Sequence, residues 1–319
     1  MKIGFFGGGA QALAILERIA SEHEIVFVHP RWVDDPLAID FARSQNLVVL
    51  EDRDINSPPA LHEIARSGAE LLVSANAKQI FKKDLLDIPS LGAINIHGGL
   101  LPRQRGGGGA YVGMINGETN GATVHFIDPG IDSGDILLQR EFDLPDDRTM
   151  ADVMTEGIRL GPQMISEVLN KIASGAVKRT SQDGKPFYYV PQKPEWDELV
   201  DWTQKSDAIL LKLRARTPGP RGTFLYCGQL YRILSAEPES LLVDHENVPG
   251  QVIGRKSHHG VLVKTGDTGI WITRVELADS GVVQTPKFWL GEMLRQNIDK
   301  EIFDLKKRVE ALEFTLSRL

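Results

Sequence analysis

Short apolar runs alternate with amphipathic stretches through the first 174 residues. The apolar runs have the length and β-branched content of strands, and the stretches between them repeat apolar positions at helical spacing. The predicted strands are Met1–Phe6, His23–Val28, Leu47–Leu50, Ala69–Ala75, Ala93–His97 and Gly121–Asp128. The predicted helices are Ala10–Ile19, Pro36–Ser44, Pro59–Ser67, Gln79–Leu86 and Met150–Ser174. This alternation predicts an α/β fold with a doubly wound, mostly parallel, Rossmann-like sheet that binds ligands beyond the carboxyl ends of its strands.

The pattern changes near residue 190, where a polar stretch with prolines and aromatics is typical of a linker. Beyond it, short strands separated by glycine and polar turns predict a small OB-like β-barrel. These strands are Thr223–Leu225, Gln229–Ser235, Gly250–Gly254, Gly260–Thr265 and Gly269–Val275. We therefore predict an α/β domain at 1–190, a barrel domain at 191–290 and an amphipathic C-terminal helix at 291–319.

The last segment repeats apolar residues every three or four positions, a period close to that of a coiled-coil seam. The residues on this seam are Leu294, Ile298, Ile302, Leu305, Val309, Leu312, Leu316 and Leu319. The pattern favours a homodimer through the C-terminal helix. The alternative is a helix that packs on its own barrel.

Composition narrows the class of protein. The chain has 319 residues, a net charge of −7 and a single cysteine, Cys227. The charge does not favour a nucleic-acid surface, and one cysteine excludes an internal disulfide and a cysteine-rich zinc site. The N-terminus begins as a strand without the pattern of a signal peptide, and no apolar run reaches membrane-spanning length. We expect a cytoplasmic protein without a membrane partner.

Three polar side chains stand at predicted strand ends. Strand alternation puts Asn95 and His97 on one face of their strand, and Asp132 lies in a tight turn after the strand that ends at Asp128. An amide donor, an imidazole and a carboxylate suit acyl transfer, which needs an oxyanion donor, a proton carrier and a group that orients it. The alternative is that these side chains only satisfy loop backbone groups.

The first predicted turn contains the spacing Gly7-x-Gly9-x-x-Ala12, which also matches the loose dinucleotide-binding pattern. The next predicted strand ends in His29 and Pro30 instead of the acidic residue that binds a ribose hydroxyl. An NAD-dependent oxidoreductase is therefore disfavoured. The loop can still offer backbone N–H groups to a ligand, or its glycines can serve the turn alone.

The order N-x-H-x-x-L-L-P-x-x-R-G from Asn95 to Gly106, followed by D-x-G-D from Asp132 to Asp135, resembles the folate-dependent formyltransferases. The family includes enzymes that formylate methionyl-tRNA, glycinamide ribonucleotide and amino sugars, and domains that hydrolyse 10-formyltetrahydrofolate. The resemblance extends through most of the chain. It implies a formyltransferase catalytic domain at 1–190 and catalytic roles for Asn95, His97 and Asp132.

The resemblance implies that a formyl group passes from 10-formyltetrahydrofolate to an amine and leaves tetrahydrofolate. Asn95 and a protonated His97 would stabilise the oxyanion, and Asp132 would favour the charged form of His97. The chemistry requires no metal ion and no covalent intermediate.

The resemblance also implies binding residues. The cofactor positions are Lys78, Gln79, Ile80, Gly99, Leu100, Leu101, Pro102, Asp128, Pro129, Gly130 and Ile131. The acceptor positions are Gly8, Gly9, Ala10, Gln11, Arg105 and His125. For His125 the alternative is that it supports a neighbouring site residue or the fold without touching the acceptor. Two departures stand out: Gly99 replaces the usual serine, and the run Gly106–Gly109 replaces a pattern that contains proline.

The acceptor is left open among four classes. The tRNA enzymes carry a basic insertion after the second strand, whereas His29–Asn46 is short and contains Asp34, Asp35 and Asp40. A primary amine on a nucleotide-linked amino sugar is therefore favoured over tRNA. The alternatives are methionyl-tRNA, a siderophore-type hydroxylamine or amine, and water, which would make the protein a 10-formyltetrahydrofolate hydrolase. A non-catalytic binding protein is the hypothesis from another class.

Overall fold

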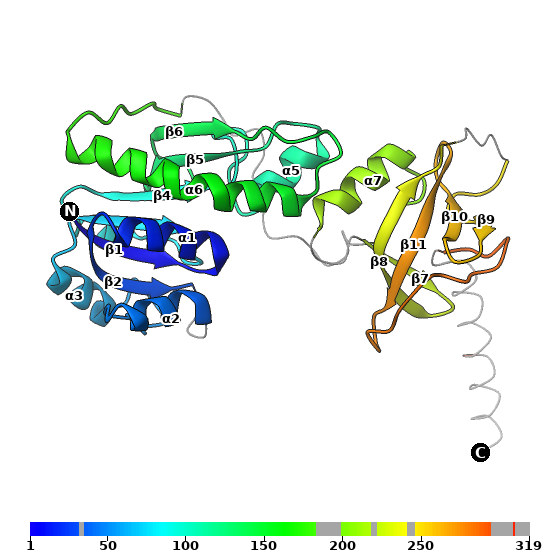
Figure 1. Ribbon diagram of the computed structural model, residues 1–319, viewed down its shortest axis with the longest axis horizontal. Helices are drawn as coiled ribbons and strands as arrows, with labels where there is room; N and C mark the ends of the chain where they lie inside the picture. The colour runs from blue at the N-terminus through cyan, green and yellow to red at the C-terminus, as the bar shows by residue number, and fades with distance from the viewer. Residues whose placement is uncertain (32–34, 183–198, 218–221, 241–245, 295–308, 310–319) are drawn as a thin grey trace, which may run out of the picture. The chain divides into compact units, whose positions relative to one another are not determined.

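The computed structural model describes residues 1–31, 35–182, 199–217, 222–240, 246–294 and 309. The chain divides into two compact units, Met1–Lys193 and Pro194–Leu319 (Figure 1). The predicted domain boundary at residue 190 and nearly all of the predicted C-terminal helix lie outside the described residues.

The first unit contains a six-stranded sheet in the order β2-β1-β3-β4-β5-β6. Its strands are β1 Lys2–Gly7, β2 Glu24–Pro30, β3 Leu71–Ala75, β4 Ala93–His97, β5 Gly121–Phe126 and β6 Ile136–Glu141. The pairings from β2 to β4 are parallel, whereas β5 and β6 join in antiparallel fashion. The prediction of a mostly parallel, Rossmann-like sheet is confirmed.

Helices cover both faces of this sheet (Figure 1). They are α1 Gly9–Ala20, α2 Pro36–Ser44, α3 Pro58–Ser67, α4 Lys83–Leu86, α5 Gly109–Ile115 and α6 Met150–Ala173. One core packs Ile15 and Leu16 of α1 with Met164 of α6, and a separate core packs Phe6 and Phe27 against the opposite face. Each face is apolar, as a sheet buried on both sides requires.

Local capping chemistry explains where several helices begin. The Asp35 side chain accepts a hydrogen bond from the Leu37 N–H at the start of α2. At the start of α6, Thr149 and Asp152 form a reciprocal capping box. These side chains satisfy backbone N–H groups that have no partner within the helix.

Two predicted elements of the first unit are wrong. The helix predicted at Gln79–Leu86 shortens to α4, because the Asn56 side chain bonds Ile80 O and Lys82 N and holds this stretch out of helical geometry. The strand predicted at Leu47–Leu50 is only a single bridge between Val28 and Val49. That bridge consists of the hydrogen bonds from the Val28 N–H to Val48 O and from the Leu50 N–H to Val28 O.

The second unit is an antiparallel sheet with one described helix. Its elements are α7 Ser206–Ala215, β7 Gly222–Tyr226, β8 Gln229–Pro238, β9 Val252–Lys256, β10 Gly260–Lys264, β11 Gly269–Leu277 and β12 Val283–Gln284. The strand order is β7-β8-β11-β10-β9, and β12 pairs with β11. Aromatic residues including Trp202, Phe224 and Phe288 form its core. The predicted C-terminal domain of short antiparallel strands is confirmed.

Within the described ranges, we find no helix that combines the length and the apolar character needed to cross a membrane.

Candidate active site

Strand register brings the central polar residues together at one edge of the first sheet. Asn95 on β4 lies opposite Ser74 on the neighbouring β3 and opposite His125 on β5. His97 follows two residues after Asn95 and therefore faces the same side. Asp132 comes from the turn between β5 and β6 and has a left-handed φ of 50°. Asn95 and His97 share one face of β4, as alternation along the strand predicts.

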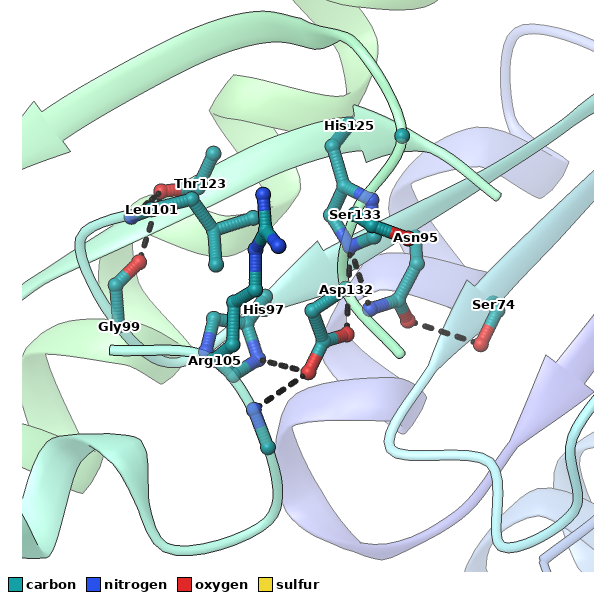
Figure 2. Close-up of polar contacts among 12 residues, drawn as sticks. Ser74, Asn95, His97, Gly99, Leu101, Arg105, Thr123, His125, Asp132 and Ser133 are labelled. Carbon is teal, nitrogen blue, oxygen red and sulfur yellow. Dashed lines mark hydrogen bonds and ion pairs between the residues drawn. The ribbon is translucent and has the colours of Figure 1, made fainter. Parts of the chain in front are cut away.

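The Asp132 carboxylate lies between two imidazoles (Figure 2). One oxygen is 3.5 Å from His97 Nδ1, and the other is 3.5 Å from His125 Nε2. The Gly106 N–H donates a hydrogen bond of 2.9 Å to the carboxylate. The three side chains are largely buried, with exposed fractions of 17% for Asp132, 11% for His97 and 3% for His125.

Burial and these partners set the protonation states. Burial lowers the pKa of His97 below its ordinary value, and the opposing effects of Asp132 and the Gln104 carbonyl do not reverse this direction. Burial alone would raise the pKa of Asp132, but its contacts with the His125 and His97 imidazoles and the hydrogen bond from the Gly106 N–H outweigh burial, so its pKa falls. The Gly106 N–H favours the carboxylate even when both imidazoles are neutral. The expected protonated His97 is therefore corrected: at neutral pH the free site holds a neutral imidazole beside a carboxylate.

The Gln104 carbonyl determines which nitrogen of His97 carries the proton. His97 Nε2 lies 2.5 Å from Gln104 O, and a carbonyl oxygen can only accept, so Nε2 donates. Nδ1 is then the atom that faces Asp132 and can take up a proton. Gly99 makes this contact sterically feasible, because a Cβ there would stand 2.8 Å from His97 Nε2 and 3.0 Å from Gln104 O.

Comparison with known proteins identifies the family. A family model described as "Formyl transferase" matches residues 13–169, and a second, "Formyl transferase, C-terminal domain", matches residues 194–292. The methionyl-tRNA formyltransferase of Ruminiclostridium cellulolyticum is 31% identical over 292 residues, which cover 88% of this chain and 93% of the relative. That of Chloroflexus aurantiacus is 31% identical over 93% of this chain and 99% of the relative. The chain belongs to the formyltransferase family.

Solved structures share the fold of this formyltransferase. An N-formyltransferase from Helicobacter canadensis, in complex with folinic acid and dTDP-3-aminofucose, has a TM-score of 0.65 at 17% identity and covers 85% of this chain and 98% of its own. HypX from Aquifex aeolicus, in complex with tetrahydrofolic acid, has a TM-score of 0.64 at 21% identity. That match covers 89% of this chain but only 46% of the HypX chain. The predicted formyl-transferring enzyme is confirmed.

The loop that follows β4 in this formyltransferase is tied to the neighbouring strand. Thr123 donates to Gly99 O at 2.7 Å and accepts from the Leu101 N–H at 3.3 Å. The Leu100 N–H donates to the Gln104 side chain, and the peptide bond before Pro102 is cis. These contacts position Gly99–Pro102, predicted to bind cofactor, beside His97.

The other predicted cofactor residues lie in two loops after strands. The Gln79 side chain, after β3, donates to Arg53 O and accepts from the Ile55 N–H, whereas Ile80 is 57% exposed. Lys78 and Gln79 line a polar cleft at the carboxyl ends of β1 and β2. After β5, Asp128 accepts from the Gly130 N–H and the Ser133 hydroxyl, which folds the 128–131 segment into a turn with Ile131 39% exposed.

The predicted acceptor residues are less uniform. The Gly9 N–H already donates to the Asp35 carboxylate, and the Gln11 side chain donates to Gly157 O on α6. Arg105 donates two hydrogen bonds to Gln182 Oε1. The His125 side chain is buried and bonds Asn95. In this structure the side chains of Gln11 and His125 bond to Gly157 O and to Asn95, and their predicted contacts with the acceptor stay predictions.

Three residues at the site were not singled out by sequence reasoning. Ser74 donates to Asn95, Gln104 orients His97, and Gln182 donates to the carbonyls of Asp132 and Gly134. Ser74 is the one polar residue in the apolar run LLVSA, which is a usable signal. The other two lie in loops and have no periodicity to mark them.

Proposed function

We propose that the protein transfers the formyl group of 10-formyltetrahydrofolate to a primary amine of a small acceptor, most simply an amino sugar linked to a nucleotide. The convergence of Asn95, His97 and Asp132 at the carboxyl end of the sheet carries the proposal. Acyl transfer needs an oxyanion donor and a proton carrier in one place, and this cluster supplies both.

In the proposed reaction the acceptor nitrogen attacks the formyl carbon, a new C–N bond forms, and the bond to N10 of the folate breaks. Asn95 donates an N–H to the formyl oxygen as its negative charge develops. Neutral His97, whose pKa is lowered by burial, takes the proton that the amine loses. Asp132 stabilises the resulting imidazolium, and the proton then passes to N10, which leaves as tetrahydrofolate. No atom of the protein bonds to the formyl group.

The preference for a small acceptor rests on the region after β2. This strand ends at Pro30 and α2 begins at Pro36, so there is no room for the basic insertion of the tRNA enzymes. In the same region the Asp35 carboxylate accepts from the Gly9 N–H, so this stretch holds a carboxylate where the tRNA enzymes carry basic residues. A siderophore-type amine or hydroxylamine fits these observations equally well.

Methionyl-tRNA is the second candidate acceptor. The names of the relatives favour it: the two described above are methionyl-tRNA formyltransferases, and each match covers more than nine tenths of the relative's length. One assay separates the candidates: release of tetrahydrofolate from 10-formyltetrahydrofolate, followed by absorbance, with no acceptor, with nucleotide-linked amino sugars, with small amines and hydroxylamines, and with methionyl-tRNA.

Release that depends on the amino-sugar pool is the expected result. Release of tetrahydrofolate with methionyl-tRNA alone would identify tRNA, and not an amino sugar, as the acceptor. Release without any acceptor would identify a hydrolase. If no pool releases tetrahydrofolate, the proposal of formyl transfer from this donor fails.

A further inference from the structure

The Asn95 amide is held from both sides by neighbouring strands. On one side the Ser74 hydroxyl donates to Asn95 Oδ1 at 2.9 Å. On the other side Asn95 Nδ2 donates to His125 Nε2 at 3.2 Å. Figure 2 shows the three side chains in line across β3, β4 and β5. The two contacts follow from strand register, which pairs Asn95 with Ser74 and with His125.

His125 can accept this hydrogen bond only as one neutral tautomer. His125 Nδ1 lies 2.7 Å from Phe126 O, which can only accept, so Nδ1 carries a proton. In the neutral ring Nε2 then holds a lone pair, and it faces the Asn95 N–H at 3.2 Å, closer than the Asp132 carboxylate oxygen at 3.5 Å. The two histidines of the site are therefore opposite tautomers, with the proton of His97 on Nε2 and that of His125 on Nδ1.

This network leaves one N–H of the Asn95 side-chain amide available to donate to a ligand. Each amide nitrogen has two N–H groups, and His125 takes one of them. In the part of the chain that the structure describes, the second N–H has no acceptor. Flipping the amide would place Oδ1 against the lone pair of His125 Nε2, which is repulsive. The orientation of Asn95 is thus determined by its two neighbours.

We propose that Ser74 and His125 are positioning residues that fix the Asn95 amide so that its remaining N–H points at the formyl oxygen. This inference rests on the proposed function for the identity of the reaction. Neither residue touches substrate. Both act by removing the alternative orientations of an oxyanion donor, and a preorganised donor stabilises the transition state more than a mobile one.

Two substitutions at position 125 distinguish the hydrogen bond that positions Asn95 from the packing of the His125 side chain. In His125→Gln the side-chain oxygen reaches the place of Nε2 and can still accept from Asn95. In His125→Asn the shorter amide reaches only the place of Nδ1, so Asn95 loses its partner. We expect His125→Asn and Ser74→Ala each to lower kcat about tenfold, the order expected for one lost hydrogen bond, with KM within about twofold. His125→Gln should stay within about threefold of wild type.

A second background tests whether the effect passes through Asn95. In Asn95→Ala, the added change His125→Asn should lower kcat by less than about twofold, because there is no amide left to orient. The same tenfold loss in both backgrounds would show that His125 acts independently of Asn95 and would overturn the inference. Wild-type kcat in His125→Asn would overturn it as well.

A measurement without substrate separates this inference from the proposed function. NMR of the ¹⁵N-labelled protein should show His125 as the Nδ1–H tautomer and slow exchange of the Asn95 side-chain amide, with faster exchange in His125→Asn and not in His125→Gln. The opposite tautomer, or amide exchange indifferent to both variants, would contradict the positioning. If the NMR result holds while no acceptor is formylated, the proposed function fails and the network stands.

Discussion

Two regions of the first unit were predicted to meet ligands, one around β4 and β5 and one after β1, and they are built in different ways. At β4 and in the turn after β5, Asn95 bonds the His125 side chain, and His97 bonds the Gln104 carbonyl and lies 3.5 Å from Asp132. After β1, the Gly9 N–H and the Gln11 side chain bond to Asp35 and to the α6 backbone. The parallel strands β1 and β4 end at the same edge of the sheet, so position in the fold does not distinguish the two regions. The two regions differ in the groups to which their polar side chains and N–H groups form hydrogen bonds.

The largest expected effect comes from removing the oxyanion donor or the proton carrier. Asn95→Ala and His97→Ala should each lower kcat at least about a hundredfold, the scale measured for such groups in other enzymes. Thermal unfolding should change little in comparison, because neither side chain belongs to the two apolar cores of this unit. A wild-type rate in either variant would remove the proposed mechanism.

Asp132→Asn sharpens the role of the carboxylate. Asparagine tolerates the left-handed φ of this position and can still accept from the Gly106 N–H, so the fold should survive. Because His97 works in its neutral form, the rate rises as pH increases through the His97 pKa, and Asp132 raises that pKa. The variant should lower kcat about tenfold or more and move the acidic limb of the kcat/KM profile to lower pH. A limb that stays in place or moves to higher pH would contradict this assignment.

Gly99→Ala tests the contact between His97 and Gln104. The added Cβ would lie 2.8 Å from His97 Nε2 and must displace the imidazole. We expect kcat to fall about tenfold, since a displacement of an ångström in a catalytic group has effects of this order or more. Gly98→Ala is the matched control, because a Cβ there meets nothing within 4 Å. Equal rates in the two variants would show that the position of His97 is not critical.

The smallest effect is expected on the other side of the comparison. Gln11→Ala removes one hydrogen bond to Gly157 O, worth about 1 kcal/mol of the free energy of unfolding. The melting temperature should fall by about 2–4 °C while the acceptor KM stays within about twofold. A tenfold rise in that KM would show that Gln11 binds the acceptor and would contradict the difference drawn between the two regions.

Much of the fold could be predicted because local chemistry agrees with it. The caps at Asp35 and Thr149 mark the starts of α2 and α6 in the sequence, and alternation places Asn95 and His97 on one face. The short α4 could not be predicted, because Asn56, more than twenty residues upstream, takes the hydrogen bonds that a longer helix would need.

The sequence predicted the catalytic side chains of the site but not their hydrogen-bond partners. Asn95, His97 and Asp132 stand out as residue types at strand ends. Their partners depend on register between strands that are distant in sequence: Ser74 reaches Asn95 across 21 positions, and His125 across 30. The neutral state of His97 also depends on burial, which the motif does not reveal.

The most direct test of the account is a single-turnover experiment with donor labelled by ¹³C in the formyl group, mixed with the acceptor found in the assay above. The account predicts that the label moves to the acceptor nitrogen in the wild-type protein. In Asn95→Ala the transfer should be about a hundredfold slower at unchanged donor affinity. Transfer at the same rate in both proteins would contradict the claim that this cluster performs the reaction.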